Sequence, residues 1–256
     1  MAGTRSKFVG GSLNFYDKTH NPSFPVGVWA DCPLLAIRND PAVGFIFEED
    51  FSNFPAAPSG TTLAGWTVTQ ATTGQVSLES AANTPGGVLL IDSNSATATQ
   101  GVQIQKADLI FKPAAGKDMW FECRLKIVDT FDKAEIFAGL SEIDTTLIAS
   151  SANSSANHIG WQCVTDDGVL LFSSEKAGTG ATKASVTIEE DTFLTLGFKI
   201  NGVTDIEHWV NGAKIATTHV TANIPTVALS PSFVCQSGGT NDPIMHLDWV
   251  RCVQLR

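Results

Sequence analysis

The stretch 193–220, FLTLGFKINGVTDIEHWVNGAKIATTHV, decides the fold of this chain. From 194 to 200 apolar residues alternate with polar or small ones, the period of two that is typical of a strand with one buried face. A second run, 205–210, leads into Asn211-Gly212, the dipeptide that best tolerates the two positive φ angles of a type I′ turn. The sequence therefore predicts an antiparallel hairpin that turns at these two residues.

The turn also predicts the register of this hairpin, because a two-residue loop sets its flanking residues opposite each other. The tryptophan of the first strand should then lie beside a lysine stem on one face of the sheet. The predicted pairs are Val210 with Ala213, Trp209 with Lys214, His208 with Ile215 and Glu207 with Ala216.

Short runs of the same kind, separated by turn residues, fill most of the chain. In the clearest of them, 119–128, Phe121 and Leu125 share an apolar face while Glu122 and Arg124 share a polar one. The expected strands are 66–70, 75–80, 87–92, 102–105, 119–128, 135–140, 158–164, 169–176, 184–188, 194–200, 205–210, 227–236 and 244–253, with 178–183 as a loop. We therefore expect an all-β sandwich of two antiparallel sheets over residues 48–256.

Composition narrows the possible partners. A formal net charge of −10 opposes binding to a phosphate backbone, so we expect no nucleic-acid partner. No segment is apolar enough to span a bilayer, and residues 1–18 lack the apolar core of a secretory signal, so we expect synthesis in a cytosol and no membrane partner. The cysteines at 32, 123, 163, 235 and 252 are widely spaced without a CxxC pair, which favours buried free thiols over a metal site or a disulfide framework.

Residues 1–47 lack a sustained helical or strand period and are broken by four prolines, so they cannot form a core alone. They are nevertheless rich in aromatic residues, unlike an ordinary disordered tail. We expect an extended N-terminal arm that buries these residues on a neighbouring subunit or along the flank of its own domain, and the sequence leaves both possibilities open. The candidate partner-binding residues are Phe8, Phe15, Tyr16, Phe24 and Trp29.

Six stretches of the sandwich region look familiar together. They are AGLSEIDTTLIAS (138–150), HIGW (158–161), FLTLGFKINGV (193–203), EHWVNGAKIA (207–216), NIPTVALSPSFVCQSGG (223–239) and MHLDWVRCVQLR (245–256). In this order they resemble a group of tailed-bacteriophage virion structural proteins. The resemblance covers about residues 45–256, and RSKFVGGSLNFYD (5–17) is similar to the arms that often precede such domains.

The resemblance implies a concanavalin A-like jelly roll, distantly similar to laminin-G-type domains, that serves as a head decoration or minor capsid component. We therefore expect a non-enzymatic protein without cofactor or metal, located on the capsid surface, with the major capsid protein as partner and a homotrimer at a symmetry axis. Some related domains belong to tails and bind glycans. A carbohydrate-binding module of a tail or baseplate is thus the alternative, with candidate loops at 141–157 and 237–243.

Glu142-Ile143-Asp144 is a candidate for catalysis, because jelly-roll glucanases resemble it with an E-x-D-x-E strand whose carboxylates line a sugar groove. Retaining glycoside hydrolysis needs two carboxyl groups about 5 Å apart. Thr146 stands where the second glutamate of that motif belongs. The sequence therefore favours an acidic turn at the end of a strand over a glycosidase site.

The other candidate sites have simpler structural explanations. His246 and Asp248 alternate on one strand near His208, but no ligand pair at fixed spacing supports a metal or acid–base site, and polar residues on a sheet surface explain them. The run 166–168, Asp-Asp-Gly, offers calcium ligands and also fits a hairpin turn. The indoles of Trp161, Trp209 and Trp249 can stack on sugars but more often lie in a core or an interface. The chain contains no Gly-x-Ser-x-Gly, P-loop or HExxH motif.

Overall fold

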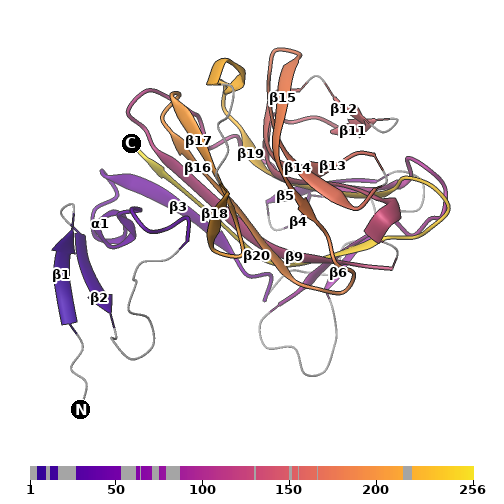
Figure 1. The fold of residues 1–256 in the computed structure, drawn as a ribbon, viewed down its shortest axis with the longest axis horizontal. Helices are drawn as coiled ribbons and strands as arrows, with labels where there is room; N and C mark the ends of the chain where they lie inside the picture. The colour runs from indigo at the N-terminus through magenta and orange to yellow at the C-terminus, as the bar shows by residue number, and fades with distance from the viewer. Residues whose placement is uncertain are drawn as a thin grey trace.

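Two eight-stranded antiparallel sheets pack face to face (Figure 1). The computed structural model describes residues 5–9, 12–16, 27–52, 62–63, 65–70, 75–78, 87–129, 131–149, 152–154, 156–165, 167–215 and 221–256. Across these residues, no helix has the length and apolar character needed to cross a bilayer. The all-β sandwich expected from the sequence is confirmed.

Sheet I has the strand order β15-β14-β13-β10-β19-β8-β5-β4. Its strands are β4 (Thr62–Leu63), β5 (Trp66–Gln70), β8 (Gly101–Lys106), β10 (Ala134–Ser141), β13 (His158–Cys163), β14 (Val169–Lys176), β15 (Thr179–Thr187) and β19 (Ser230–Ser237). A short hairpin, β11 (Ile148–Ala149) with β12 (Ala152–Asn153), and the 3-10 helices η1 (Phe131–Lys133) and η2 (Thr221–Asn223) lie outside both sheets. Because β19 pairs with both β10 and β8, the sheet depends on contacts between segments about a hundred residues apart in sequence.

Sheet II has the order β18-β17-β16-β9-β20-β7-β6, and β3 also pairs with β20. Its strands are β3 (Gly44–Glu49), β6 (Gln75–Leu78), β7 (Leu89–Asp92), β9 (Met119–Val128), β16 (Leu194–Asn201), β17 (Asp205–Val210), β18 (Ala213–Ile215) and β20 (Ile244–Leu255). The long strand β20 pairs along one edge with β7 through its first half and with β3 through its second half. The N-terminal and C-terminal parts of the chain therefore lie side by side in this sheet (Figure 1).

The hairpin predicted at 205–215 is confirmed in register. Val210 pairs with Ala213, and the next two predicted pairs follow in the predicted order. Asn211 and Gly212 have φ angles of 50° and 75°, as a type I′ turn requires. The fourth predicted pair involves Ala216, which lies outside the described residues.

Aromatic rings from both sheets meet in the centre of the core. Phe198 of β16 stacks on Phe121 of β9, with centroids 4.8 Å apart, and meets Phe172 of β14 edge-on at 5.4 Å. All three side chains are fully buried, in keeping with the alternation of their strands. The five cysteines are free thiols, and all except the half-buried Cys32 are buried.

One strand is longer than the sequence indicates. Residues 178–183 were expected to form a loop, but β15 begins at Thr179 and pairs with β14 after a tight turn at Ala177-Gly178. This edge strand is largely exposed, so it lacks the apolar alternation that marks the other strands. A bulge at Ala184, with φ of 56°, further breaks its period.

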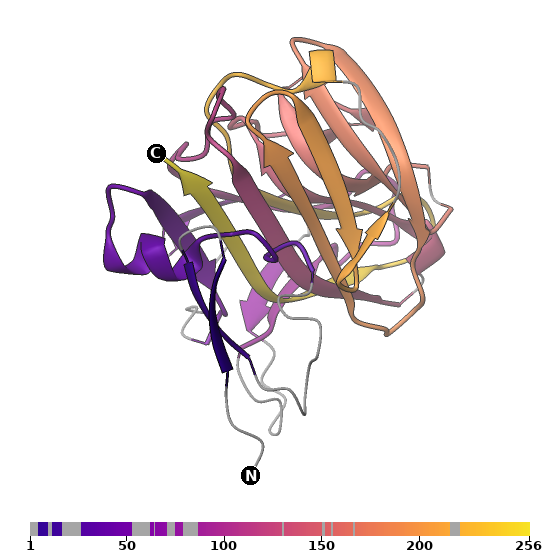
Figure 2. The same ribbon diagram turned by 60° about the vertical axis from the view of Figure 1, so that its left-hand side comes forward.

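The N-terminal segment has secondary structure of its own. The antiparallel strands β1 (Arg5–Val9) and β2 (Ser12–Tyr16) form a hairpin, hereafter the leading hairpin, which Figure 2 shows to one side of the sandwich. The short helix α1 (Leu34–Asn39) and strand β3 follow. Because residues 44–47 already pair with β20, the expected boundary between residues 47 and 48 falls inside β3, and the sheet begins at Gly44.

Candidate functional site

The outer face of sheet I, which points away from the core, carries a row of buried amides and hydroxyls. Gln103 and Gln105 come from β8, Ser141 from β10 and Ser232 from β19. The side-chain nitrogen of Gln105 donates to the hydroxyl oxygens of Ser141 at 2.8 Å and Ser232 at 3.0 Å. The row therefore joins three neighbouring strands.

A segment that follows β10, residues 142–149, lies over this row, and we call it the cover segment. Gln105 accepts a hydrogen bond from the backbone N–H of Asp144 at 3.1 Å, and Gln103 accepts one from that of Leu147 at 2.9 Å. Leu147 also packs in a small apolar cluster with Phe137 of the same sheet face. The centre of this face is therefore occupied by the protein's own chain.

Gln105→Leu is expected to lower the free energy of unfolding by about 1–3 kcal/mol, because it removes the hydrogen bonds of the Gln105 amide and leaves the backbone N–H of Asp144 without this acceptor. Urea unfolding measures the change. Gln70→Leu is the control, since it makes the same change of side chain at a half-buried glutamine at the end of β5, opposite Val102 rather than in the amide row, and its expected effect is within about 0.5 kcal/mol. Equal losses in the two variants would show that the amide row does not hold the cover segment.

The candidate catalytic carboxylates are engaged in local structure. The side chain of Glu142 accepts hydrogen bonds from Asn157, one from the backbone N–H at 3.2 Å and one from the side-chain amide at 2.6 Å. Asp144 accepts one from the backbone N–H of Thr146 at 2.9 Å. The acidic stretch thus forms a turn after β10, which agrees with the structural interpretation of the sequence.

A cavity of about 500 Å³ lies beside the cover segment on the same sheet face. The described residues that line it carry no charge: Thr69, Gln70, Thr99, Gly101, Val102, Gln103, Thr145, Thr146, Ile148, Val234 and Gln236. At one side Gln236 donates a hydrogen bond to Glu135, a fully buried carboxylate that the sequence analysis did not single out. Amides and hydroxyls in a half-open cavity suit a hydroxyl-rich ligand rather than an ionic one.

The histidine grouping considered from the sequence does not form. His208 is fully buried in the core, within 4.4 Å of the Phe172 ring by centroid, because it pairs with the core residue Phe198. His246 lies on the opposite, outer face of sheet II, between core residues of β20, and Asp248 binds Arg124. Within the part of the chain that the structure describes, no group of three or more His, Cys, Asp or Glu side chains is placed to hold a metal ion.

Strands β13 and β14 pair as a hairpin, and Asp167 and Gly168 lie between them in the chain. Asp167 accepts a hydrogen bond from the backbone N–H of Val169 at 3.0 Å, and Gly168 has a positive φ of 67°. Asp166 lies outside the described residues. Asp167 and Gly168 therefore stabilise a turn between the two strands.

The three tryptophans considered for sugar stacking occupy different environments. Trp161 is fully buried in the core, where its indole N–H donates to the carbonyl of Gly197 at 3.3 Å. Trp209 is half-buried in a cluster on the outer face of sheet II. Trp249 lines a second cavity on that same face. None of the three lines the cavity on sheet I.

Among the five arm residues, Trp29 is placed on its own domain. Its indole N–H donates a hydrogen bond to Glu122 of β9 at 2.5 Å. The sequence left open whether the arm lies on a neighbouring subunit or on its own domain, and Trp29 lies on its own domain. Phe8, Phe15 and Tyr16 belong to the leading hairpin, where Phe8 pairs with Leu13 and Phe15 with Ser6 along the backbone. Phe24 lies outside the described residues. Partner binding by these four residues stays a prediction.

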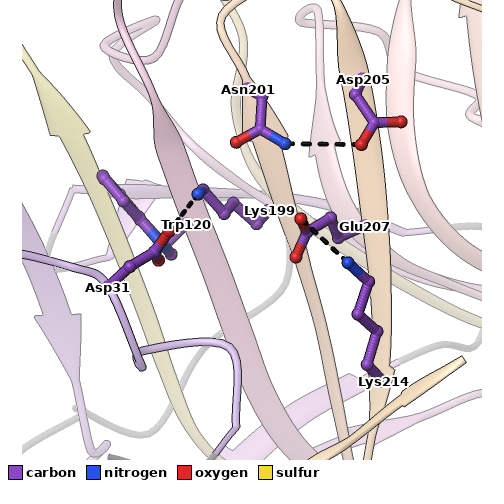
Figure 3. Close-up of polar contacts among 7 residues, drawn as sticks. All are labelled: Asp31, Trp120, Lys199, Asn201, Asp205, Glu207 and Lys214. Carbon is purple, nitrogen blue, oxygen red and sulfur yellow. Dashed lines mark hydrogen bonds and ion pairs between the residues drawn. The ribbon is translucent and has the colours of Figure 1, made fainter.

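Asp31, two residues after Trp29, also fastens this part of the arm to sheet II (Figure 3). Its carboxylate forms an ion pair with Lys199 of β16 and accepts a hydrogen bond from the Trp120 indole of β9 at 2.9 Å. Burial alone raises the pKa of Asp31, but the hydrogen bonds from Lys199 and Trp120 outweigh it, so the pKa lies below its ordinary value. Asp31 is therefore ionised at neutral pH and pairs two distant segments.

Asp31→Ala is expected to lower the free energy of unfolding by about 1–3 kcal/mol, because it leaves the buried ammonium of Lys199 without its ion pair. The partial exposure of Asp31 keeps the loss below that of a fully buried pair. Denaturant unfolding at neutral pH measures it. The control is Lys214→Ala, which removes the pair with Glu207 drawn in Figure 3 and should cost less than about 1 kcal/mol, because the lysine of this pair is 48% exposed whereas Lys199 is 9% exposed. A larger loss in the control would refute this role of Asp31.

No protein-family model matches the chain, and no curated protein sequence matches it significantly. A protein of unknown function from Shewanella oneidensis MR-1 is similar with a TM-score of 0.61 at 16% identity, covering 91% of this chain and 97% of that one. Endo-1,3-beta-glucanase from Streptomyces sioyaensis has a TM-score of 0.55 at 15% identity, with coverages of 82% and 95%. The carbohydrate recognition domain of Emp47p has a TM-score of 0.55 at 10% identity, with coverages of 83% and 97%.

The fold is a concanavalin A-like jelly roll. At these identities the likeness concerns the fold alone, and proteins that share a fold can differ entirely in function. The jelly roll thus agrees with the architecture expected from the sequence. A hydrolase and a carbohydrate recognition domain both have this fold, so the function has to be argued from the residues of this chain.

Proposed function

We propose that this chain is a non-enzymatic structural protein of a tailed-bacteriophage particle, made in the host cytoplasm, which binds adjacent major capsid subunits on the head surface as a homotrimer. The proposal rests on the resemblance of the six motifs and on one structural observation. That observation is a leading hairpin with three aromatic residues that precedes the jelly roll and pairs only with itself among the described strands.

The leading hairpin consists of two strands of five residues each. An isolated two-stranded hairpin is marginally stable in water, and each of its outer edges presents unpaired backbone N–H and C=O groups. Such edges are suited to pairing with a strand of another molecule. A neighbouring subunit would supply the contacts that the hairpin does not find in its own sheets.

The attachment of this hairpin to the sandwich supports a role in bridging. Residues 27–49 are held on sheet II by the Trp29–Glu122 hydrogen bond, the Asp31–Lys199 ion pair and the pairing of β3 with β20. The described residues that follow the hairpin in the chain, from residue 27 on, are therefore fixed on the jelly roll. A tethered element that binds a neighbour raises affinity through effective concentration, which is useful in a clamp between subunits.

The non-enzymatic part of the proposal is supported by the outer face of sheet I. Glu142 and Asp144 are tied to Asn157 and Thr146, and the cover segment lies over the middle of the face. An open groove with two free carboxyl groups, which retaining glycoside hydrolysis requires, is not found among the described residues of this face.

Quantitative mass spectrometry of purified particles tests the proposal. We expect a copy number that is a large and fixed fraction of the number of major capsid subunits. A chain that lacks residues 1–16 should be depleted from particles while its far-ultraviolet spectrum still shows a β-sandwich. A few copies per particle in the wild type would exclude a decoration role.

A carbohydrate-binding module of a tail or baseplate is the second candidate, and the uncharged cavity beside the cover segment favours it. Its amides and hydroxyls match the hydroxyl groups of a sugar, although no aromatic ring among its described lining residues offers a stacking surface. A glycan array at millimolar sugar, repeated with Thr69→Val and Thr146→Val, tests it. Binding that both substitutions weaken would support this candidate, and no binding would exclude it.

A further inference from the structure

A second cavity, of about 570 Å³, opens on the outer face of sheet II and differs from the first in charge. The described residues that line it are Trp29, Glu48, Glu49, Asp50, Glu122, Trp249, Val250 and Arg251. Four carboxylates and one arginine thus line the cavity, and two indole rings form part of its wall. Arg38, outside the lining, also pairs with Glu48 at 2.9 Å, so the carboxylates outnumber the two arginines by two. We call this cavity the acidic pocket.

The register of three neighbouring strands builds the acidic pocket. Arg251 of β20 lies opposite Glu48 of β3 on one side and opposite Glu122 of β9 on the other. A shift of register between Leu247 and Trp249 turns the strand just before this row. The N-terminal segment then adds Trp29 from above the sheet, where its indole N–H donates to Glu122.

Arg251 already shows how a cation binds in this pocket. Its guanidinium lies 5.2 Å from the centre of the Trp29 ring, and its Nε is 2.7 Å from a carboxylate oxygen of Glu48. An indole face and a carboxylate are the two groups that best accommodate a guanidinium or ammonium. Trp249, Glu49 and Asp50 line the remainder of the pocket, where the two carboxylates also accept hydrogen bonds from the backbone N–H groups of Phe51 and Ser52.

One of the carboxylates in the acidic pocket, that of Glu122, is buried. Glu122 is only 8% exposed, and the Trp29 indole donates a hydrogen bond to one of its two oxygens, with no other donor to this carboxylate among the described residues. Burial raises the pKa of Glu122, and the Trp29 hydrogen bond and the charge of Arg251 only partly offset this. Because burial disfavours the charged form of Glu122, a further cation in the pocket would stabilise that form.

The sequence contains a segment of opposite charge. Residues 1–26 carry three of the 16 basic residues of the chain, Arg5, Lys7 and Lys18, but only one of its 26 acidic residues, Asp17. They are a basic segment in a chain of formal net charge −10. Two of the three basic residues lie in β1 of the leading hairpin.

We propose that the acidic pocket receives a cationic side chain of the leading hairpin, Arg5 or Lys7, from a second copy of the chain. Complementary charge selects this partner, because a second copy brings both the basic strand and an acidic pocket of its own. This contact lies between copies of the proposed trimer. The inference therefore rests on the self-association in the proposed function and on no other part of it. It is tested without any capsid protein, so its failure leaves the location on the particle open.

Sedimentation equilibrium of the full-length protein at low and high salt measures this contact. One variant reverses the pocket with Glu49→Lys and Asp50→Lys, and another reverses the hairpin with Arg5→Glu and Lys7→Glu. A third carries all four substitutions. The matched control, Glu189→Lys with Glu190→Lys, makes the same change of charge at two exposed acidic residues outside the pocket.

We expect the wild type to self-associate more weakly at high salt, since such contacts are screened. Each reversal alone should weaken association at least about tenfold at low salt, whereas the control should not. The variant with all four substitutions should associate again, because its reversed hairpin matches its reversed pocket. A mixture of the two reversed variants should also associate, which establishes that the contact joins different copies. A monomeric wild type, or reversals that associate like the wild type or like the control, would overturn the proposal.

Discussion

Phe198→Ala is expected to lower the free energy of unfolding by about 3–5 kcal/mol. Phe198 is fully buried, stacks on Phe121 at 4.8 Å with an interplanar angle of 13°, and meets Phe172 of the other sheet at 5.4 Å. Alanine at this position leaves a cavity between the two sheets, and its close-packed surroundings can collapse into it only in part. The ring therefore contributes to the adhesion of the sheets as well as to its own strand.

Denaturant unfolding of the wild type and the variant at one pH measures this loss. Leu109→Ala is the control, because the side chain of Leu109 is 43% exposed and its removal should change the free energy by no more than about 0.5 kcal/mol. A loss below about 1 kcal/mol for Phe198→Ala would contradict the position of this ring at the centre of the sandwich.

The second large effect is a loss of stability in mild acid that depends on His158. This residue is 2% exposed, with one ring nitrogen 2.9 Å from the carbonyl of Ala156 and the other 3.0 Å from the hydroxyl of Ser173. Burial lowers its pKa to about 4, whereas an unfolded histidine has a pKa of about 6.5. Between these two values the unfolded chain binds a proton that the folded chain does not, so folding becomes less favourable as the pH falls.

The free energy of unfolding should therefore fall by on the order of 3 kcal/mol from this group between about pH 6.5 and pH 4, and the contribution should level off below that range. Urea unfolding at several pH values, for the wild type and for His158→Gln, isolates it from the other titrating groups. The variant should show a shallower pH dependence over this interval. Parallel curves for the two proteins would show that His158 is not buried in its neutral form.

Local patterns in the sequence predict those elements whose partner is close in the chain. The hairpin around Asn211 and Gly212 was predicted in register, since the turn residues alone set the pairing. Strand β9 was predicted to the residue, because Phe121 and Leu125 face the core while Arg124 faces outward. In both places the short-range signal and the final fold agree.

The sequence does not predict contacts that join distant segments. The cover segment is held by Gln103 and Gln105, about forty residues earlier in the chain, and no local period indicates that two glutamines will bind backbone groups there. The Asp31–Lys199 pair spans 168 positions and was missed for the same reason. Such pairs become visible only when the strand order is known.

His208 is a case in which the signal was present but was interpreted wrongly. The predicted hairpin itself sets His208 on the same face as Ile206, and that face is buried because β17 pairs with the core strand β16. A polar residue in an alternating strand is usually assigned to the surface. Here the ring packs against Phe172 and Trp161, so the aromatic surroundings of the core accommodate it.

Cryo-electron microscopy of the assembled phage particle tests the central claim most directly. We expect density of the jelly roll on the head surface, repeated at symmetry axes of the shell, with residues 5–16 of each copy in contact with a neighbouring molecule. Density confined to the tail would contradict the proposed location. A leading hairpin without any neighbour in the assembled particle would contradict the bridging role.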